Sequence, residues 1–117
     1  MMVRPTILID MRKHRIRIHK HTLQAIGNPD FVMLIINPIE YTLGIKCGVV
    51  DDKLALRIRK SNMRNDYELY SKSLMYALHE LCPEWDGSKS HRIEGEIIVG
   101  ENMAVFSMED PSCQVIE

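Results

Sequence analysis

The amino-acid sequence predicts an α+β fold, mainly β, in which two β-β-α-β-β repeats form a single domain over residues 1–117. Short segments with alternating apolar and polar residues, a pattern typical of half-buried strands, recur along the chain. One segment after Ser71 instead has apolar residues at helical spacing. The length of 117 residues and the apolar fraction of 45% exclude a large multidomain enzyme.

The first half of the chain is predicted to contain four strands and one short helix. The strands are expected over Pro5–Met11, Arg15–His19, Phe31–Asn37 and Tyr41–Cys47. Between the second and third strands, Leu23 and Ile26 lie three residues apart, which predicts one or two helical turns over His21–Ile26. We expect Thr22 to cap this helix and Gly27 to end it.

The second half repeats this order. Strands are predicted over Leu54–Arg59, Tyr67–Tyr70, His91–Val99 and Met103–Met108. In the first of these, Leu54, Leu56 and Ile58 are expected on the buried side, and a turn is predicted before it at Asp51–Asp52. A helix is predicted between a cap near Ser71 and Pro83. Its apolar stripe consists of Leu74, Met75, Leu78, Leu81 and Cys82.

The two halves are interpreted as internal repeats over residues 5–47 and 53–108, followed by a mobile tail over residues 109–117. In each repeat a lysine, Lys20 or Lys72, stands between a short strand and a helix. Units of about 50 residues bury little surface alone, so we expect the repeats to pair about a pseudo-two-fold axis.

This order of elements resembles the swapped-hairpin domain of AbrB-like and SpoVT-like transcription regulators, and the tandem arrangement is similar to MraZ-like proteins. The resemblance covers roughly Pro5 to Met108 and implies one interlocked, double-split β-barrel. It also implies DNA binding through basic residues of the first two strands and the loop between them. The residues at these positions are Arg12, Lys13, Arg15 and Arg17, together with Lys20.

The sequence departs from the family at three places. His19 stands where Pro is common, and Asn28–Asp30 where a Gly-Asp turn is common. The second repeat carries Asp66 and Glu68 on its second strand instead of basic residues. Two-fold binding of a DNA operator would therefore require two chains, which makes a homodimer a possible assembly.

Charge is divided unevenly between the halves. Residues 1–60 contain eleven basic and five acidic residues, a formal charge of +6, and residues 61–117 contain four basic and eleven acidic residues, a formal charge of −7. Either a basic face binds a polyanion, or the two halves attract each other when they pack. A third interpretation is that these charges are only the solvated faces of strands and a helix.

Two functional hypotheses follow. The first is a DNA-binding transcription regulator or antitoxin-like protein that contacts the phosphates of double-stranded DNA through the basic N-terminal strand face. Alternate residues on that face are about 6.6–7 Å apart, a spacing that can follow successive phosphates. The alternative is a non-enzymatic protein–protein interaction module on the same scaffold.

The sequence predicts no catalytic site, metal site or cofactor, and hence no enzyme. His19 and His21 have no second ligand pair at structural-zinc spacing, and Cys82 continues the apolar stripe, which leaves His79 at the rim of the core. Trp85 is expected to cover one end of the core. Three cysteines without CxxC spacing and no apolar run of transmembrane length predict a cytoplasmic protein with reduced thiols and no membrane contact.

Overall fold

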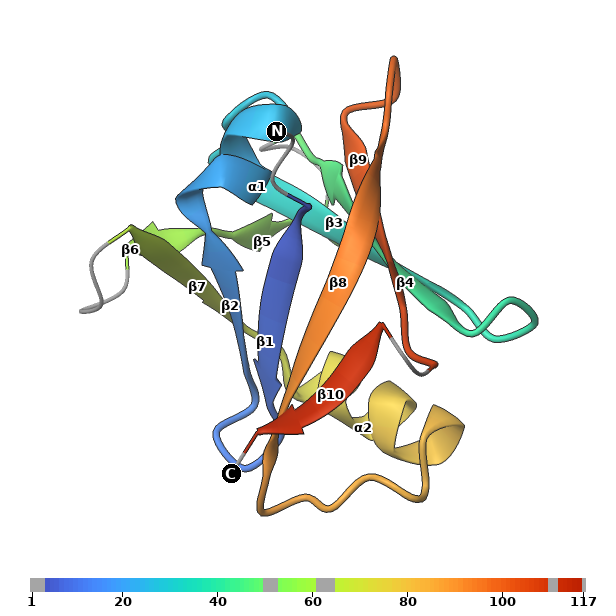
Figure 1. Cartoon of the computed structure of the whole chain (residues 1–117). Coiled ribbons are helices and arrows are strands. Elements are labelled where there is room, and N and C mark those ends of the chain that lie inside the picture. The colour runs from blue at the N-terminus through green and yellow to red at the C-terminus, as the bar shows by residue number, and fades with distance from the viewer. Residues whose placement is uncertain (1–3, 50–52, 61–64, 110–111, 117) are drawn as a thin grey trace.

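The computed structural model describes residues 4–49, 53–60, 65–109 and 112–116 (Figure 1). In the first half the elements are β1 (Thr6–Asp10), β2 (Arg15–His19), α1 (Lys20–Ala25), β3 (Phe31–Asn37) and β4 (Thr42–Cys47). In the second half they are β5 (Leu56–Arg57), β6 (Arg59–Lys60), β7 (Asp66–Tyr70), α2 (Lys72–Leu81), β8 (Ser90–Ile98), β9 (Met103–Ser107) and β10 (Cys113–Ile116). The prediction of a mainly β protein is confirmed.

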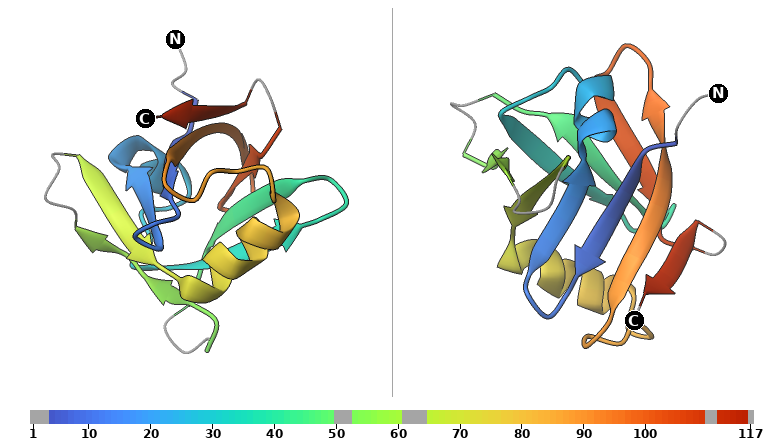
Figure 2. Two further views of the ribbon diagram at one scale, coloured as in Figure 1. Left: turned by 90° about the horizontal axis from the view of Figure 1, so that it is seen from below. Right: turned by 60° about the vertical axis from the view of Figure 1, so that its left-hand side comes forward.

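The strands form one antiparallel sheet that curls into a nearly closed barrel (Figures 1 and 2). Its order is β5-β3-β4-β9-β8-β1-β2-β7-β6, and β10 is added beside β8. The two end strands follow each other directly in the chain. Because β5 pairs with β3 and β6 pairs with β7, the segment Leu56–Lys60 joins the two ends of the sheet.

Alternation along the strands explains the core. In β1 and β2 every second residue, Ile7, Ile9, Ile16 and Ile18, points into the barrel and is buried. The two helices lie at opposite ends of the barrel, α1 at the upper end and α2 at the lower end in Figure 1. Their buried residues belong to the same cluster as the strands: Leu23 and Ile26 from the α1 end, and Leu74, Met75 and Leu78 from α2.

The helix limits are close to those predicted, but the cap of α1 is different. The Nδ1 atom of His19, and not the hydroxyl of Thr22, accepts a hydrogen bond from the first turn, from the backbone N–H of His21 at 3.1 Å. Thr22 is buried one residue further on, and its hydroxyl accepts the N–H of Thr6 at 3.3 Å. Gly27 ends α1 with φ +99°, as the sequence predicts.

The predicted strand over Leu54–Arg59 is wrong at its start and is divided in the middle. Leu54 is 75% exposed, and pairing begins only at Leu56. The division occurs at Ile58, whose N–H donates to the carbonyl of Asp30 while the chain passes from one end of the sheet to the other. The turn predicted at Asp51–Asp52 lies outside the described residues.

The mobile tail predicted over residues 109–117 is wrong for Cys113–Ile116. These residues form β10, which pairs antiparallel with Ser90–Ile93 of β8. Because β9 pairs with β8 only from Gly95 onward, the preceding edge of β8 offers backbone groups that β10 satisfies. Cys113 is buried there, so the C-terminal segment is part of the packed structure.

Candidate functional site

The outer face of β8, β1, β2 and β7 carries the arginines that the sequence analysis selected on the second strand. Since the isoleucines of β2 point inward, Arg15 and Arg17 point outward. The register places Leu8 of β1 opposite both Arg17 of β2 and Arg92 of β8, and Arg17 opposite Glu68 of β7. Arg92, Leu8, Arg17 and Glu68 therefore form one row across four strands.

Carboxylates from both halves of the chain neutralise part of this face. The guanidinium of Arg15 lies 3.1 Å from Oδ2 of Asp10 and 3.6 Å from Oε2 of Glu68. Only 12% of the Arg15 side chain and 16% of the Glu68 side chain is exposed. Arg17 reaches the same Glu68 oxygen with its Nε, at 3.9 Å. Arg15 is thus held between two carboxylates and is not open to a phosphate.

Arg12 and Lys13 lie in the turn between β1 and β2. The turn is closed by the N–H of His14, which donates to the carbonyl of Met11 at 3.3 Å, and by Asp10, whose Oδ1 accepts the N–H of Lys13 at 3.3 Å. Both cationic side chains are exposed and form no ion pair with another residue in the part of the chain that the structure describes.

Lys20 is the first residue of α1, at the other end of β2 from that turn. The five residues selected from the sequence therefore occupy three different places: the β1–β2 turn, the ion-paired face of β2, and the start of α1. Strand alternation could predict that Arg15 and Arg17 point outward. It could not predict that Glu68, from the other half of the chain, would lie opposite them.

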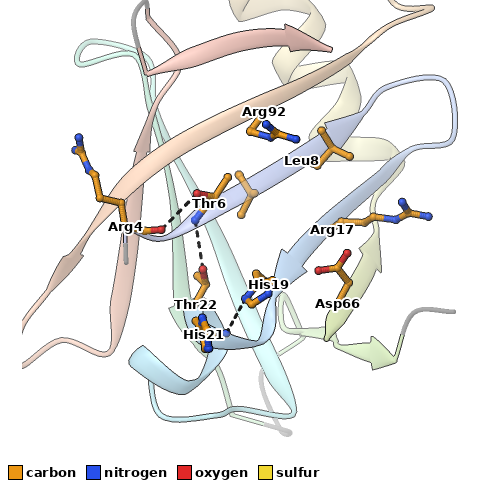
Figure 3. Close-up of a pocket in the computed structure, with 10 residues that line it drawn as sticks. Arg4, Thr6, Leu8, Arg17, His19, His21, Thr22, Asp66 and Arg92 are labelled. Carbon is orange, nitrogen blue, oxygen red and sulfur yellow. Dashed lines mark hydrogen bonds between the residues drawn. The ribbon is translucent and has the colours of Figure 1, made fainter. Parts of the chain in front are cut away.

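A groove crosses the outer face at Arg17, as Figure 3 shows. It has a volume of about 570 Å³ and is lined by Arg4, Thr6, Ile7, Leu8, Arg17, His19, His21, Thr22, Asp66 and Arg92. Sequence reasoning did not select Arg4 or Arg92, because Arg4 precedes the first predicted strand and Arg92 belongs to the acidic half. The signal that could have identified Arg92 is its alternation with inward-pointing residues along β8.

Arginines predominate among the charges of this groove. Arg4, Arg17 and Arg92 line it together with a single carboxylate, Asp66. Arg4 lies at 3.7 Å from both Glu94 and Glu96, in pairs that are largely exposed and therefore weak. Arg92 is exposed and has no ion pair within the described residues. The groove is therefore suited to an anionic group.

A second polar feature lies at the lower end of the barrel, where Trp85 stacks on His91. The two rings are 4.1 Å apart and nearly parallel, with an angle of 12°. Trp85 is 8% exposed, so the prediction that it covers one end of the core is confirmed. His91 is buried on the inner side of β8, and neither of its ring nitrogens has a hydrogen-bond partner in the part of the chain that the structure describes. Burial lowers its pKa.

The histidine and cysteine side chains of the described residues do not gather into a metal site. Among the residues that the structure describes, no group of three or more His, Cys, Asp or Glu side chains could hold a metal ion. Cys82 is buried in the core, while His79 is exposed on α2. His19 uses Nδ1 to cap α1, and its ring lies 4.7 Å from that of His21.

Searches against protein-family models, curated proteins and solved structures find no significant match for this chain. Within the described residues, no helix has both the length and the apolar character needed to cross a membrane.

Proposed function

We propose that the protein is a non-enzymatic protein–protein interaction module that associates with a second copy of itself through the open edge of β3. The observation that carries this proposal is the pairing of β3. One edge of β3 is paired with β4 from Val32 to Asn37, whereas the opposite edge is paired with β5 only at Phe31 and Val32. The edge of Met33–Asn37 is therefore without a strand partner among the described residues.

The direction of the backbone groups on this edge follows from the register. The N–H of Cys47 donates to Asn102, toward β9, so Cys47 does not exchange hydrogen bonds with its β3 partner Val32. Alternation in an antiparallel ladder then directs the backbone groups of Met33 and Ile35 toward β4. The N–H and carbonyl groups of Leu34 and Ile36 consequently face the open edge.

The surroundings of the edge are apolar. A groove of about 420 Å³ beside it is lined by Leu34, Ile36, Leu54, Leu56 and Leu74, with Lys53, Ser71 and Ser73 at its borders. Ile35, on the other side of the strand, is 44% exposed. From Phe31 to Asn37 the strand contains no charged residue and no proline, the residues that usually protect sheet edges from pairing.

A second copy is the occupant that this edge fits without further assumptions. Two copies of one strand pair antiparallel about a two-fold axis, so the interface is self-complementary. With the axis at Ile35, Leu34 of one copy lies opposite Ile36 of the other, and each such pair exchanges two hydrogen bonds through the outward backbone groups. The same pairing brings the two apolar strand faces together.

Light scattering coupled to size exclusion, over a range of protein concentrations, tests this proposal. We expect a dimer that is insensitive to salt, because backbone hydrogen bonds and apolar contacts hold it. Ile35→Lys should yield a monomer, while Ile39→Lys, at a residue 94% exposed in the adjoining hairpin turn, should leave the dimer intact. A monomer at all concentrations, or equal effects of both substitutions, would overturn the proposal.

We further propose that the barrel is a swapped-hairpin assembly of two pseudo-two-fold related repeats. In support, β1 pairs with β2 of its own half and β8 of the other half, and the segment β5–β6 pairs with β7 of its own half and β3 of the other. The two hairpins β3–β4 and β8–β9 meet through β4 and β9. Each repeat thus completes the sheet of the other.

DNA binding is retained as a second candidate because Arg12 and Lys13 are exposed and unpaired within the described residues, on a turn where the resemblance to AbrB-like regulators implies DNA contacts. Association of two chains would supply a second such turn. At low salt, fluorescence anisotropy should show that the unchanged protein binds a random DNA duplex and that the double variant Arg12→Glu, Lys13→Glu does not. The variant Arg57→Glu, at an exposed arginine, is the control and should still bind. Absent binding, or equal loss in the control, would exclude this candidate.

A further inference from the structure

The groove on the outer face of β8, β1 and β2 has the features of a small-anion site. Arg92 and Arg17 flank Leu8 on the two neighbouring strands (Figure 3). Strands are spaced by about 4.7–4.9 Å, so the two Cα atoms are about 10 Å apart, and arginine side chains can converge on one group above Leu8. The register therefore places two arginines on either side of one apolar residue.

Neither guanidinium is fully committed to a carboxylate. Arg92 has no ion pair within the described part of the chain, and its side chain is exposed. The Nε of Arg17 lies 3.9 Å from Oε2 of Glu68, beyond hydrogen-bond distance, and this buried Nε has no hydrogen-bond partner among the described residues. The terminal amino groups of Arg17 form no ion pair among the described residues. Both arginines can therefore donate to a ligand.

The remainder of the groove determines the kind of ligand. Its floor is apolar at Leu8, and Arg4 lines it further along. Arginine forks match the paired oxygens of phosphate groups, and contacts to a doubly charged group are stronger than neutral hydrogen bonds. We propose that this groove binds a small phosphate monoester, with the phosphate above Leu8 between Arg92 and Arg17 and an apolar or aromatic portion along the groove toward Thr6.

The acidic residues around the groove favour a small ligand over a nucleic acid. Asp66 lies within it, Glu68 adjoins Arg17, and Glu94 follows Arg92 on the same outer side of β8. A polyanion that extends beyond the groove would pass close to these carboxylates. A small monoester that occupies only the part of this 570 Å³ groove around Leu8 meets the two arginines without extending along the face past these carboxylates.

Titration of the isotope-labelled protein with phenyl phosphate, monitored by amide NMR shifts, tests the site. We expect saturable shifts centred on Leu8, Arg17 and Arg92 at millimolar ligand, and weaker saturable binding of inorganic phosphate. Arg92→Gln should weaken phenyl phosphate binding by about tenfold, the loss of one charged hydrogen-bond pair. Arg17→Gln should weaken it similarly.

Arg57→Gln, at an exposed arginine of β5 far along the sheet order from β1, is the matched control and should bind like the unchanged protein. Absence of saturable shifts, equal weakening in Arg57→Gln, or phenol binding as strong as phenyl phosphate would each overturn the proposal. Failure of this proposal can be distinguished from failure of the self-association proposal. The Ile35→Lys variant should bind phenyl phosphate like the unchanged protein, whatever its oligomeric state.

Discussion

At the scale of single residues, His91 couples the stability of the fold to pH. His91 is 1% exposed, its ring is stacked on Trp85, and neither ring nitrogen has a hydrogen-bond partner within residues 4–49, 53–60, 65–109 and 112–116. Burial, the main cause, lowers its pKa from the ordinary value of 6.5, and the charge of Asp86 opposes this only in part. As the pH falls below 6.5, His91 of the unfolded chain binds a proton more readily than His91 of the folded protein. The free energy of unfolding therefore decreases as the pH decreases.

We therefore predict that the free energy of unfolding by urea decreases from about pH 7.5 to about pH 5, and that His91→Phe reduces this decrease. Trp85, the one tryptophan in the chain, reports the transition by its fluorescence. His79→Phe, at an exposed histidine of α2, should keep the original pH dependence. An unchanged pH dependence in His91→Phe would contradict the assignment.

Gly95 of β8 allows β9 to approach closely because it has no Cβ atom. A Cβ atom there would collide with the carbonyl oxygen of Val105 and lie 2.6 Å from Cδ1 of Phe106. Because both neighbours are part of the β9 ladder and the core, neither can move freely. Gly95→Ala should therefore cost about 1–3 kcal/mol, the range of overpacked cores. Gly87→Ala is the control, because no atom lies within 4 Å of the added Cβ. It should change the free energy of unfolding, measured by urea unfolding as for Gly95→Ala, by less than about 0.5 kcal/mol.

At the scale of elements, the junction of β2 and β7 joins the two halves by opposite charge. Ile16 and Ile18 point inward on β2, and Tyr67 and Leu69 pack against the same core on β7. Arg17 and Glu68 occupy the corresponding positions between them and lie opposite each other. Two identical strands would bring like charges together here, so this pair favours the pairing of one half with the other.

Removing the carboxylate tests this junction. Glu68→Gln leaves the nearly buried Arg15 with one anionic partner fewer and should lower the free energy of unfolding by about 1–3 kcal/mol. Glu94→Gln removes a carboxylate from the exposed pair with Arg4 and should cost less than about 0.5 kcal/mol. Equal effects of the two substitutions, measured by urea unfolding, would show that Glu68 contributes no more than a surface charge.

At the scale of the whole molecule, closure of the barrel depends on short and terminal segments. The segment Leu56–Lys60 links the ends of the sheet. The strand β10 pairs with the edge of β8 that contains His91. A chain ending at Glu109 loses the β10 ladder and the burial of Cys113, and its free energy of unfolding should fall by about 2 kcal/mol or more. Thermal unfolding followed by circular dichroism measures this change. An unchanged midpoint would mean that β10 adds no stability.

The sequence by itself determined the local structure. Alternation in β1, β2 and β8, the helical stripe of α2 and the turn at Gly27 all follow from contacts among residues close in the chain, and these predictions are confirmed. The same local patterns identified which arginines would face outward. They could not identify β10 or the exposure of Leu54, because both depend on whether a distant strand offers an edge.

Only the tertiary structure decided what lies opposite each charged side chain. Arg15 and Glu68 are far apart in the sequence, and the antiparallel register of β2 and β7 brings their charges together. The same kind of long-range pairing puts Arg92, from the acidic half, beside Leu8 and within reach of Arg17. Charge neutralisation and ligand grooves depend on distances in space, which an alternation pattern along the chain does not contain.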